Sequence, residues 1–186
     1  MPELYRAFPW DADAASGESG GPLHVPRQTQ GFGRHDNPEL FGTLYLSRTK
    51  AAAAAEVIRM LRTPALRDAE LRIEGAPIAL AGFEEPDDLD LLDLDDPTTL
   101  GARGLRPSGV ATRDRERTQA VAADIFHDGY GGFEWWSTIE ASWINVTLFQ
   151  ERSVDRLRIT EEPEVLTIHH PAVIEAAGVV GLDLPG

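Results

Sequence analysis

The chain has 186 residues, of which 42% are hydrophobic and 26% charged, so it can form one globular domain with a sizeable buried core. It contains no Cys, which excludes disulfides, thiolate nucleophiles and zinc–thiolate sites. With 31 acidic and 17 basic residues, the net charge of −14 opposes general binding to DNA or RNA.

The N-terminal residues lack the basic segment and the apolar run of a signal peptide. No apolar stretch approaches the roughly 20 residues that span a membrane. We therefore expect a cytoplasmic protein with no membrane partner and no direct contact with nucleic acid.

The first part of the chain predicts two strands and a helix separated by turn-rich loops. Residues 4–8 favour a strand, and the small and polar residues from Asp11 to Pro22 favour a loop. A second turn-rich segment, residues 31–38, precedes a strand over residues 43–47. Ser47 or Thr49 then caps a helix from Lys50 to Arg62, which stops before Pro64.

The second part predicts further strands and two helices. Residues 71–83 suit one or two strands with a turn at Gly75, and residues 133–137 and 142–149 form two more. Helices are expected over residues 113–127 and 171–177, and a strand pair over residues 157–160 and 165–168. The acidic run from Glu84 to Asp96 is either a patch for a cation or a partner, or a solvated face whose leucines turn inward.

Familiar catalytic motifs are absent. Gly31-Phe32-Gly33 begins like a dinucleotide fingerprint, but no strand leads into it and no third Gly opens a helix. His169 and His170 would point to opposite faces of an extended segment, so a metal pair is not expected.

What remains are polar residues within apolar surroundings: Arg6, Arg34, Tyr45, Glu56 and Ser137. Glu56 follows five alanines and precedes Val57 and Ile58. It either faces solvent, paired with Arg59 or Arg62 at helical spacing, or faces a site. Arg6 and Arg34 could instead form salt bridges that only stabilise the fold. Tyr45 and Ser137 would then be a core tyrosine and a strand-end serine.

Five segments, in this order, resemble the RES-domain family. They are Leu4-Tyr5-Arg6, Gly33-Arg34-His35-Asp36-Asn37, Leu44-Tyr45-Leu46-Ser47, Ala53-Ala54-Ala55-Glu56-Val57, and Trp135-Trp136-Ser137 followed by Asn145 to Phe149. The resemblance spans residues 4 to about 150. Against the family pattern, His35 replaces a tryptophan, Ser47 replaces an alanine, and Asp36 is an apparent insertion before Asn37.

The resemblance implies an α+β fold similar to the ADP-ribosyltransferase fold, a mixed β core with packed helices. Residues 1–186 would form one domain, with residues 151–186 as a C-terminal extension packed on the motif-bearing part. It also implies a toxin that degrades NAD by cleaving the nicotinamide–ribose bond, with water, inorganic phosphate or a protein side chain as acceptor. A separate Xre-type helix-turn-helix antitoxin, a basic protein, would neutralise it.

Each motif residue takes a role from this resemblance. Glu56 would stabilise the oxocarbenium-like transition state and grip a ribose hydroxyl. Arg6 and Arg34 would bind the pyrophosphate of NAD, with Arg6 also at the catalytic centre. Tyr45 would stack on nicotinamide or ribose, and Ser137 would hydrogen-bond at the same site. No metal or further cofactor is required. The alternative is a non-catalytic protein of the same fold that binds a nucleotide or a partner protein.

Overall fold

The computed structural model describes residues 3–61, 63 and 65–185. Its strands are β1 (Glu3–Pro9), β2 (Thr43–Ser47), β3 (Arg72–Ile73), β4 (Ala76–Glu84), β5 (Leu91–Asp93), β6 (Gly132–Trp136), β7 (Ile144–Phe149) and β8 (Arg158–Val165). Its α-helices are α1 (Lys50–Ile58), α2 (Pro97–Ala102), α3 (Pro107–Val110), α4 (Arg115–His127), α5 (Gln150–Ser153) and α6 (Pro171–Val180).

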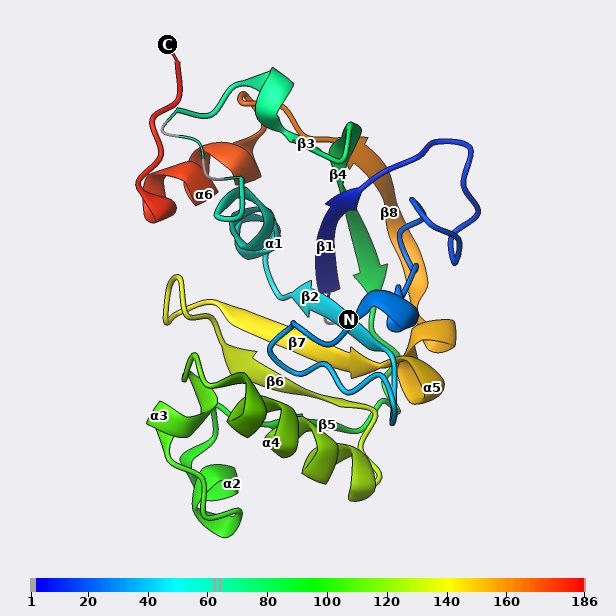
Figure 1. Cartoon of the computed structure of the whole chain (residues 1–186), viewed down its shortest axis with the longest axis vertical. Coiled ribbons are helices and arrows are strands. Elements are labelled where there is room, and N and C mark those ends of the chain that lie inside the picture. The colour runs from blue at the N-terminus through cyan, green and yellow to red at the C-terminus, as the bar shows by residue number, and fades with distance from the viewer. Residues whose placement is uncertain (1–2, 62, 64, 186) are drawn as a thin grey trace.

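The strands form a mixed sheet in the order β3-β4-β1-β2-β7-β6-β5, with β8 paired to β4. Strands β5 and β6 run parallel, whereas the other pairs are antiparallel. Helices α1 and α6 lie beside the β1–β4 half, and α2, α3 and α4 lie beside the β5–β7 half (Figure 1). This arrangement confirms the expected α+β fold with a mixed β core.

The two halves of the sheet meet at a short junction. Strand β1 pairs with β4 along its whole length, and β2 pairs with β7 along its whole length. Between β1 and β2, by contrast, the register contains the single pair Tyr5↔Ser47. The central strands therefore diverge on either side of this pair, and a pocket can open between them.

Helix α1 forms because strong helix formers follow an N-cap residue. The Thr49 hydroxyl accepts a hydrogen bond from Ala52 N at 3.2 Å, which confirms one of the two predicted caps. The alanines are buried and allow close approach to α6 and to Tyr5, Ile78 and Leu80 of the sheet. The helix ends at Ile58, earlier than predicted; Arg62 and Pro64 lie outside the described residues.

Helix α4 covers the β5–β6 part of the sheet. The Asp114 carboxylate accepts a hydrogen bond from Arg117 N at 3.2 Å, and the helix starts at Arg115, two residues after its predicted start. Its buried residues Ala122 and Ile125 pack with Phe133 and Phe149 in a core of their own. A further core, which includes Leu44, Leu46 and Val146, lies between the strands and the loops that cover them.

The acidic run from Glu84 to Asp96 has its leucines turned inward: Leu89, Leu92 and Leu94 are buried. Several of its acids have internal partners. Glu85 pairs with Arg48, Asp88 with Arg156 and Glu84 with Arg158, while Asp96 caps α2. The inward leucines agree with the interpretation of this run as a solvated acidic face. Residues 91–93 of the run also form the short strand β5.

The strand pair predicted in the tail is wrong. Residues 158–165 form the single strand β8, which pairs with β4 across two register shifts. Glu161-Glu162-Pro163 looks like a turn in the sequence. A proline is nevertheless tolerated in a strand that has a neighbour on one side only, because its missing N–H faces away from the ladder.

Candidate active site

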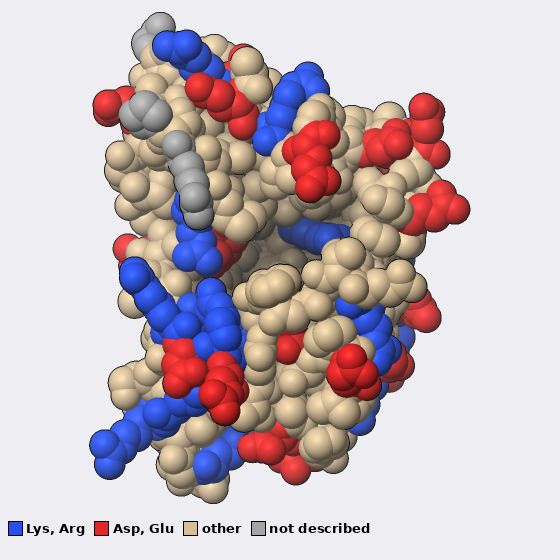
Figure 2. All heavy atoms as spheres, in the orientation of Figure 1, with Lys and Arg blue, Asp and Glu red and all other residues tan. Residues whose placement is uncertain are grey.

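A pocket of about 510 Å³ lies where β1 and β2 diverge, bounded also by α1 and the 30–34 loop. Four of the five residues singled out in the sequence line it: Arg6, Arg34, Tyr45 and Glu56. Figure 2 shows a hollow in the middle of this face, with Lys and Arg atoms in its depth and at its edge. Four arginines, Arg6, Arg34, Arg59 and Arg115, line this pocket, although the net charge of the chain is −14.

Glu56 is the carboxylate of this pocket. Its side chain projects from the last turn of α1 and is 25% exposed. Oε2 forms an ion pair with Arg59 Nη2, 2.9 Å away, which is one of the helical pairs considered in the sequence. The structure therefore unites both interpretations: Glu56 is ion-paired and also lines the pocket.

Two residues, one on β7 and one directly after β6, donate to the other oxygen of Glu56, and Ser47 on β2 orients one of them. Oε1 accepts hydrogen bonds from Asn145 Nδ2 at 2.8 Å and from Ser137 Oγ at 3.3 Å. Ser47 Oγ donates to Asn145 Oδ1 at 2.7 Å, so the amide group of Asn145 must turn its N–H toward Glu56. Ile139 N donates to Ser137 Oγ at 3.1 Å, which leaves the Ser137 proton for the carboxylate. The carboxylate is thereby oriented by donors on fixed strands.

Ser137 does not line the pocket itself. It is 2% exposed and reaches the site only through Glu56, so the structure places it as a residue that positions the carboxylate. Sequence reasoning missed Asn145 and Ser47. The available signal was a polar residue in the middle of the apolar strand from Trp143 to Phe149, since buried amides normally have a specific partner.

Arg6 projects from β1 and is partly buried. Its Nη1 donates to the carbonyl of Pro22 at 2.7 Å, and its guanidinium lies over the Phe8 ring at 5.4 Å from the centroid. Burial lowers the pKa of Arg6 to about 10, so the group is still positively charged at neutral pH. No carboxylate of the described residues forms an ion pair with it, which leaves its charge available to an anion.

Arg34 lies in the loop before β2 and is buried. Its Nη1 donates to the carbonyls of Thr112 at 2.5 Å and Val110 at 3.3 Å, and its guanidinium lies 5.1 Å from the centroid of Trp135. Burial, and then the nearby charge of Arg115, lowers the pKa of Arg34, whereas the Glu56 carboxylate acts in the opposite direction. Arg34 and Glu56 line the same pocket, where their opposite charges attract.

Replacement of Arg34 by Lys is expected to weaken capture of a dianionic ligand about 10-fold or more. The planar guanidinium can donate to two carbonyls, stack on Trp135 and bind an anion at the same time. The ammonium of Lys has no planar face to stack and cannot make all of these contacts together. The measurement is the dissociation constant of ADP-ribose for parent and variant. Arg103→Lys, at an exposed pair with Asp128, is the matched control. Equal affinity in the parent and both variants would remove Arg34 from the anion site.

The loop before β2 is held by Asp36, the apparent insertion in the motif. Its Oδ2 accepts hydrogen bonds from Gly31 N at 2.9 Å and Gly33 N at 2.7 Å, and its Oδ1 accepts from the Tyr45 hydroxyl at 2.7 Å. Burial, and then the charge of Asp36, raises the pKa of Tyr45 well above its ordinary value. Tyr45 is thus a neutral donor whose ring lines the pocket, and Asp36 is part of a tightly bonded loop.

His35 occupies the family's tryptophan position within an aromatic cluster. Its ring contacts Phe133 and Trp135 edge-on, with centroids 4.7 and 5.0 Å away, and Nδ1 lies 2.9 Å from Thr147 Oγ1. Trp135 Nε1 donates to the same hydroxyl at 3.0 Å, so this hydroxyl can in turn donate to a neutral imidazole. Burial, reinforced by Arg34 and Arg115, lowers the pKa of His35 well below its ordinary value. His35 therefore acts as a core aromatic residue.

His35 should make the protein less stable in acid. Because its folded pKa lies below that of the unfolded chain, the unfolded state takes up the proton first, and stability falls as pH drops below about 6.5. The loss is at most about 1.4 kcal/mol per pH unit. Urea titrations of parent and His35→Phe between pH 7.5 and 5 should show a steeper loss in the parent. Parallel curves would contradict this.

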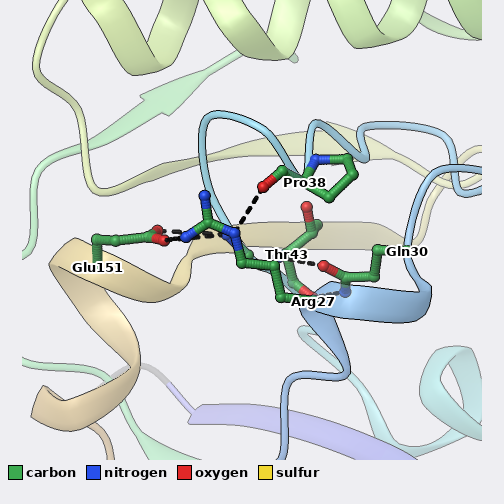
Figure 3. Close-up of polar contacts among 6 residues, drawn as sticks. Arg27, Gln30, Pro38, Thr43 and Glu151 are labelled. Atoms are coloured by element: carbon green, nitrogen blue, oxygen red, sulfur yellow. Dashed lines mark hydrogen bonds and ion pairs between the residues drawn. The ribbon is translucent and has the colours of Figure 1, made fainter.

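A second network fixes the outer wall of the pocket (Figure 3). Gln30 pairs with the backbone of Thr43 like a strand residue: Nε2 donates to the carbonyl at 2.6 Å, and Oε1 accepts from the N–H at 2.9 Å. Arg27 donates to the Pro38 carbonyl at 2.6 Å and pairs with Glu151 of α5. The loop that carries Arg34 is thus fastened at its start and at its end.

The sequence did not predict that two further arginines line the pocket, although it offered Arg59 as an ion-pair partner of Glu56. Arg59 at the end of α1 and Arg115 at the start of α4 both line the pocket and are exposed. Arg115 has no ion-pair partner among the described residues. Single charged residues in helix ends carry no sequence signal of their own, because solvent-facing arginines are common there.

The structure is thus an α+β protein whose mixed sheet opens into a pocket at its centre. Several arginines line this pocket around one hydrogen-bonded carboxylate on α1. The model of the RES domain matches residues 3–170, so the chain belongs to the RES domain family. No curated protein matches the chain.

One solved structure with the same fold is a crystal structure of the M. tuberculosis MbcT–MbcA toxin–antitoxin complex. The similarity has a TM-score of 0.65 at 22% sequence identity, and it covers 96% of this chain and 88% of that chain. Because the match extends over nearly the whole chain, β8 and α6 belong to the common fold.

Two further findings concern other classes of site. Within the described residues, no group of three or more His, Asp or Glu side chains is placed to hold a metal ion. None of the helices in the described part of the chain is long and apolar enough to cross a membrane.

Proposed function

We propose that this protein is the toxin of a toxin–antitoxin pair and that it degrades NAD by cleaving the nicotinamide–ribose bond. The supporting observation is that Glu56, held by Asn145 and Ser137, shares one pocket with Arg6 and Arg34. A pyrophosphate requires fixed cations, and the reaction requires a negative charge near the ribose. The pocket contains both.

In the proposed reaction the C1′–N bond of the nicotinamide ribose breaks, and its electron pair moves to the ring nitrogen, which neutralises the pyridinium. Positive charge develops on C1′ and the ribose oxygen. A carboxylate that is already oriented stabilises this charge without reorganising, as in glycoside cleavage. Glu56 takes this role, and its free lone pairs accept a ribose hydroxyl.

The other residues bind and orient the substrate. Arg6 and Arg34 bind the pyrophosphate from two walls, and Arg115 adds charge at the rim. The Tyr45 ring packs against nicotinamide or ribose. Ser137 acts through Glu56, because its hydroxyl bonds to that carboxylate and does not line the pocket.

The acceptor enters from the open side of the pocket. An oxygen of inorganic phosphate or of water forms the new bond to C1′; water loses a proton to solvent in doing so. The cationic rim formed by Arg59 and Arg115 favours phosphate, which arrives as an anion. Transfer to a protein side chain is the remaining acceptor class.

The test is incubation of the purified protein with NAD, with and without inorganic phosphate, followed by measurement of free nicotinamide and of the ribosyl product. Release of nicotinamide in either condition supports cleavage. ADP-ribose phosphate as the product assigns phosphorolysis, and ADP-ribose assigns hydrolysis. Absence of nicotinamide release by folded protein in every condition would contradict the enzyme and leave a non-catalytic, ligand-binding member of the family.

The regulation follows from the chemistry. An enzyme that drains NAD has to be blocked in its own cell, and the solved structure of the same fold is of a toxin–antitoxin complex. We therefore assign this chain a protein antitoxin, of the Xre type, that covers the mouth of the pocket.

A further inference from the structure

The most exposed large hydrophobic side chain among the described residues stands at the mouth of the pocket. Phe32 is 92% exposed and lines the pocket beside Met60, which is 59% exposed. By contrast, Phe41, nine residues later, is completely buried. Phe32 therefore contributes nothing to the core, and its apolar surface becomes useful only when another molecule covers it.

The turn that carries Phe32 is firmly held. Gly31 N and Gly33 N donate to Asp36, and the carbonyls of the same two glycines accept hydrogen bonds from Gln119 Nε2 at 3.1 and 3.0 Å. Both backbone neighbours of Phe32 are thus bonded on two sides, although the Phe32 ring itself is free.

Both glycines are needed for this turn. Gly31 has a φ of +143°, which L side chains rarely adopt. A Cβ on Gly33 would lie 2.5 Å from both carboxylate oxygens of Asp36. The backbone is therefore shaped to project the residue between the glycines toward the pocket mouth.

We propose that Phe32 stacks on the adenine ring of the dinucleotide, an inference that rests on the proposed function. The reacting bond must reach Glu56, whose side chain is 25% exposed, whereas Phe32 is 92% exposed. The base at the other end of the substrate then lies toward the mouth. The exposed phenyl ring has no stacking partner within the protein, and a planar purine can provide one. Such stacking typically increases affinity about 10-fold.

Binding of two half-substrates tests this without requiring turnover. AMP carries the adenine, whereas nicotinamide mononucleotide carries the reacting end and no adenine. Calorimetric titrations would compare the parent with Phe32→Ala, Phe32→Trp and Leu40→Ala. Leu40 is an exposed apolar residue on the same loop that does not line the pocket, so Leu40→Ala is the matched control.

We expect Phe32→Ala to weaken AMP binding about 10-fold and to leave binding of nicotinamide mononucleotide unchanged. Phe32→Trp should retain AMP binding, and Leu40→Ala should bind both ligands like the parent. Failure of the parent to bind AMP, equal AMP affinity in parent and Phe32→Ala, or an equal loss for both ligands would overturn the proposal.

Nicotinamide release by the parent is measured separately. If AMP binding depends on Phe32 but no nicotinamide is released from NAD, the adenine site stands and the proposed function fails. If NAD is cleaved and Phe32→Ala changes neither its KM nor AMP affinity, the function stands and the adenine site fails.

Discussion

Replacement of Glu56 by Gln is expected to reduce nicotinamide release by roughly 100-fold or more while the protein stays folded. Loss of one preorganised charge opposite the developing cation costs about 3 kcal/mol of transition-state stabilisation. The substitution is close to isosteric, and its amide oxygen can still accept from Asn145 and Ser137. Initial rates of nicotinamide release at saturating NAD would measure the effect, with the thermal unfolding midpoint as the check on folding.

Two controls separate the charge of Glu56 from its surroundings. Arg59→Ala removes the ion pair at 2.9 Å but keeps the carboxylate, so its rate should fall far less than that of Glu56→Gln. Asp128→Asn removes a carboxylate from an exposed pair away from the pocket and should leave the rate unchanged. A Glu56→Gln variant that turns over NAD at the parental rate would require another group to stabilise the transition state.

The strand and the helix that form two sides of this pocket could be predicted, because the local sequence of each one favours it. The strand at residues 43–47 and the start of the helix at Lys50 coincide with prediction, since a β-branched and aromatic run is followed directly by a cap and by alanines. The resemblance of five ordered segments to the RES-domain family suggested that Arg6, Arg34, Tyr45 and Glu56 belong together. Their common pocket confirms that they do.

The support of the carboxylate could not be predicted from the sequence. Asn145 reaches Glu56 because β7 lies between β2 and β6, so that residue 145 is paired with Ser47 on one side and with Trp135 on the other. Strand order and register are long-range properties, and the sequence of each strand alone does not specify them. The positioning role of Ser137 depends on the same register.

The sequence around residues 35 and 36 was misleading, because the roles of these two residues depend on tertiary contacts. Asp36 interrupts the expected motif, yet its carboxylate joins Gly31, Gly33 and Tyr45. The departure from the pattern is therefore compensated within the loop. His35 replaces a larger aromatic residue and still fills the cluster, because the hydroxyl of Thr147 provides a partner for its nitrogen.

The charge distribution restricts how an antitoxin can block the pocket. The acids Glu84, Glu85 and Asp88 already pair with arginines of the same chain, so a basic partner gains little from these three carboxylates. The mouth itself presents Arg59 and Arg115 beside apolar side chains. If the antitoxin is basic, as we propose, we expect it to insert an acidic or apolar segment there, since positive charge would be repelled.

Expression of the chain alone is expected to stop bacterial growth and to lower cellular NAD, because each active molecule consumes a shared cofactor. Glu56→Gln, produced at the same level, should permit growth, and co-expression with the proposed antitoxin should restore growth and NAD in cells that make the parental protein. Colony counts and extracted NAD measure both effects. Since Asp128→Asn keeps the proposed site intact, it should be as toxic as the parent. Normal growth and normal NAD in cells that contain soluble, active parent protein would contradict the assignment as a toxin. Growth arrest by Glu56→Gln would show that toxicity does not depend on this carboxylate.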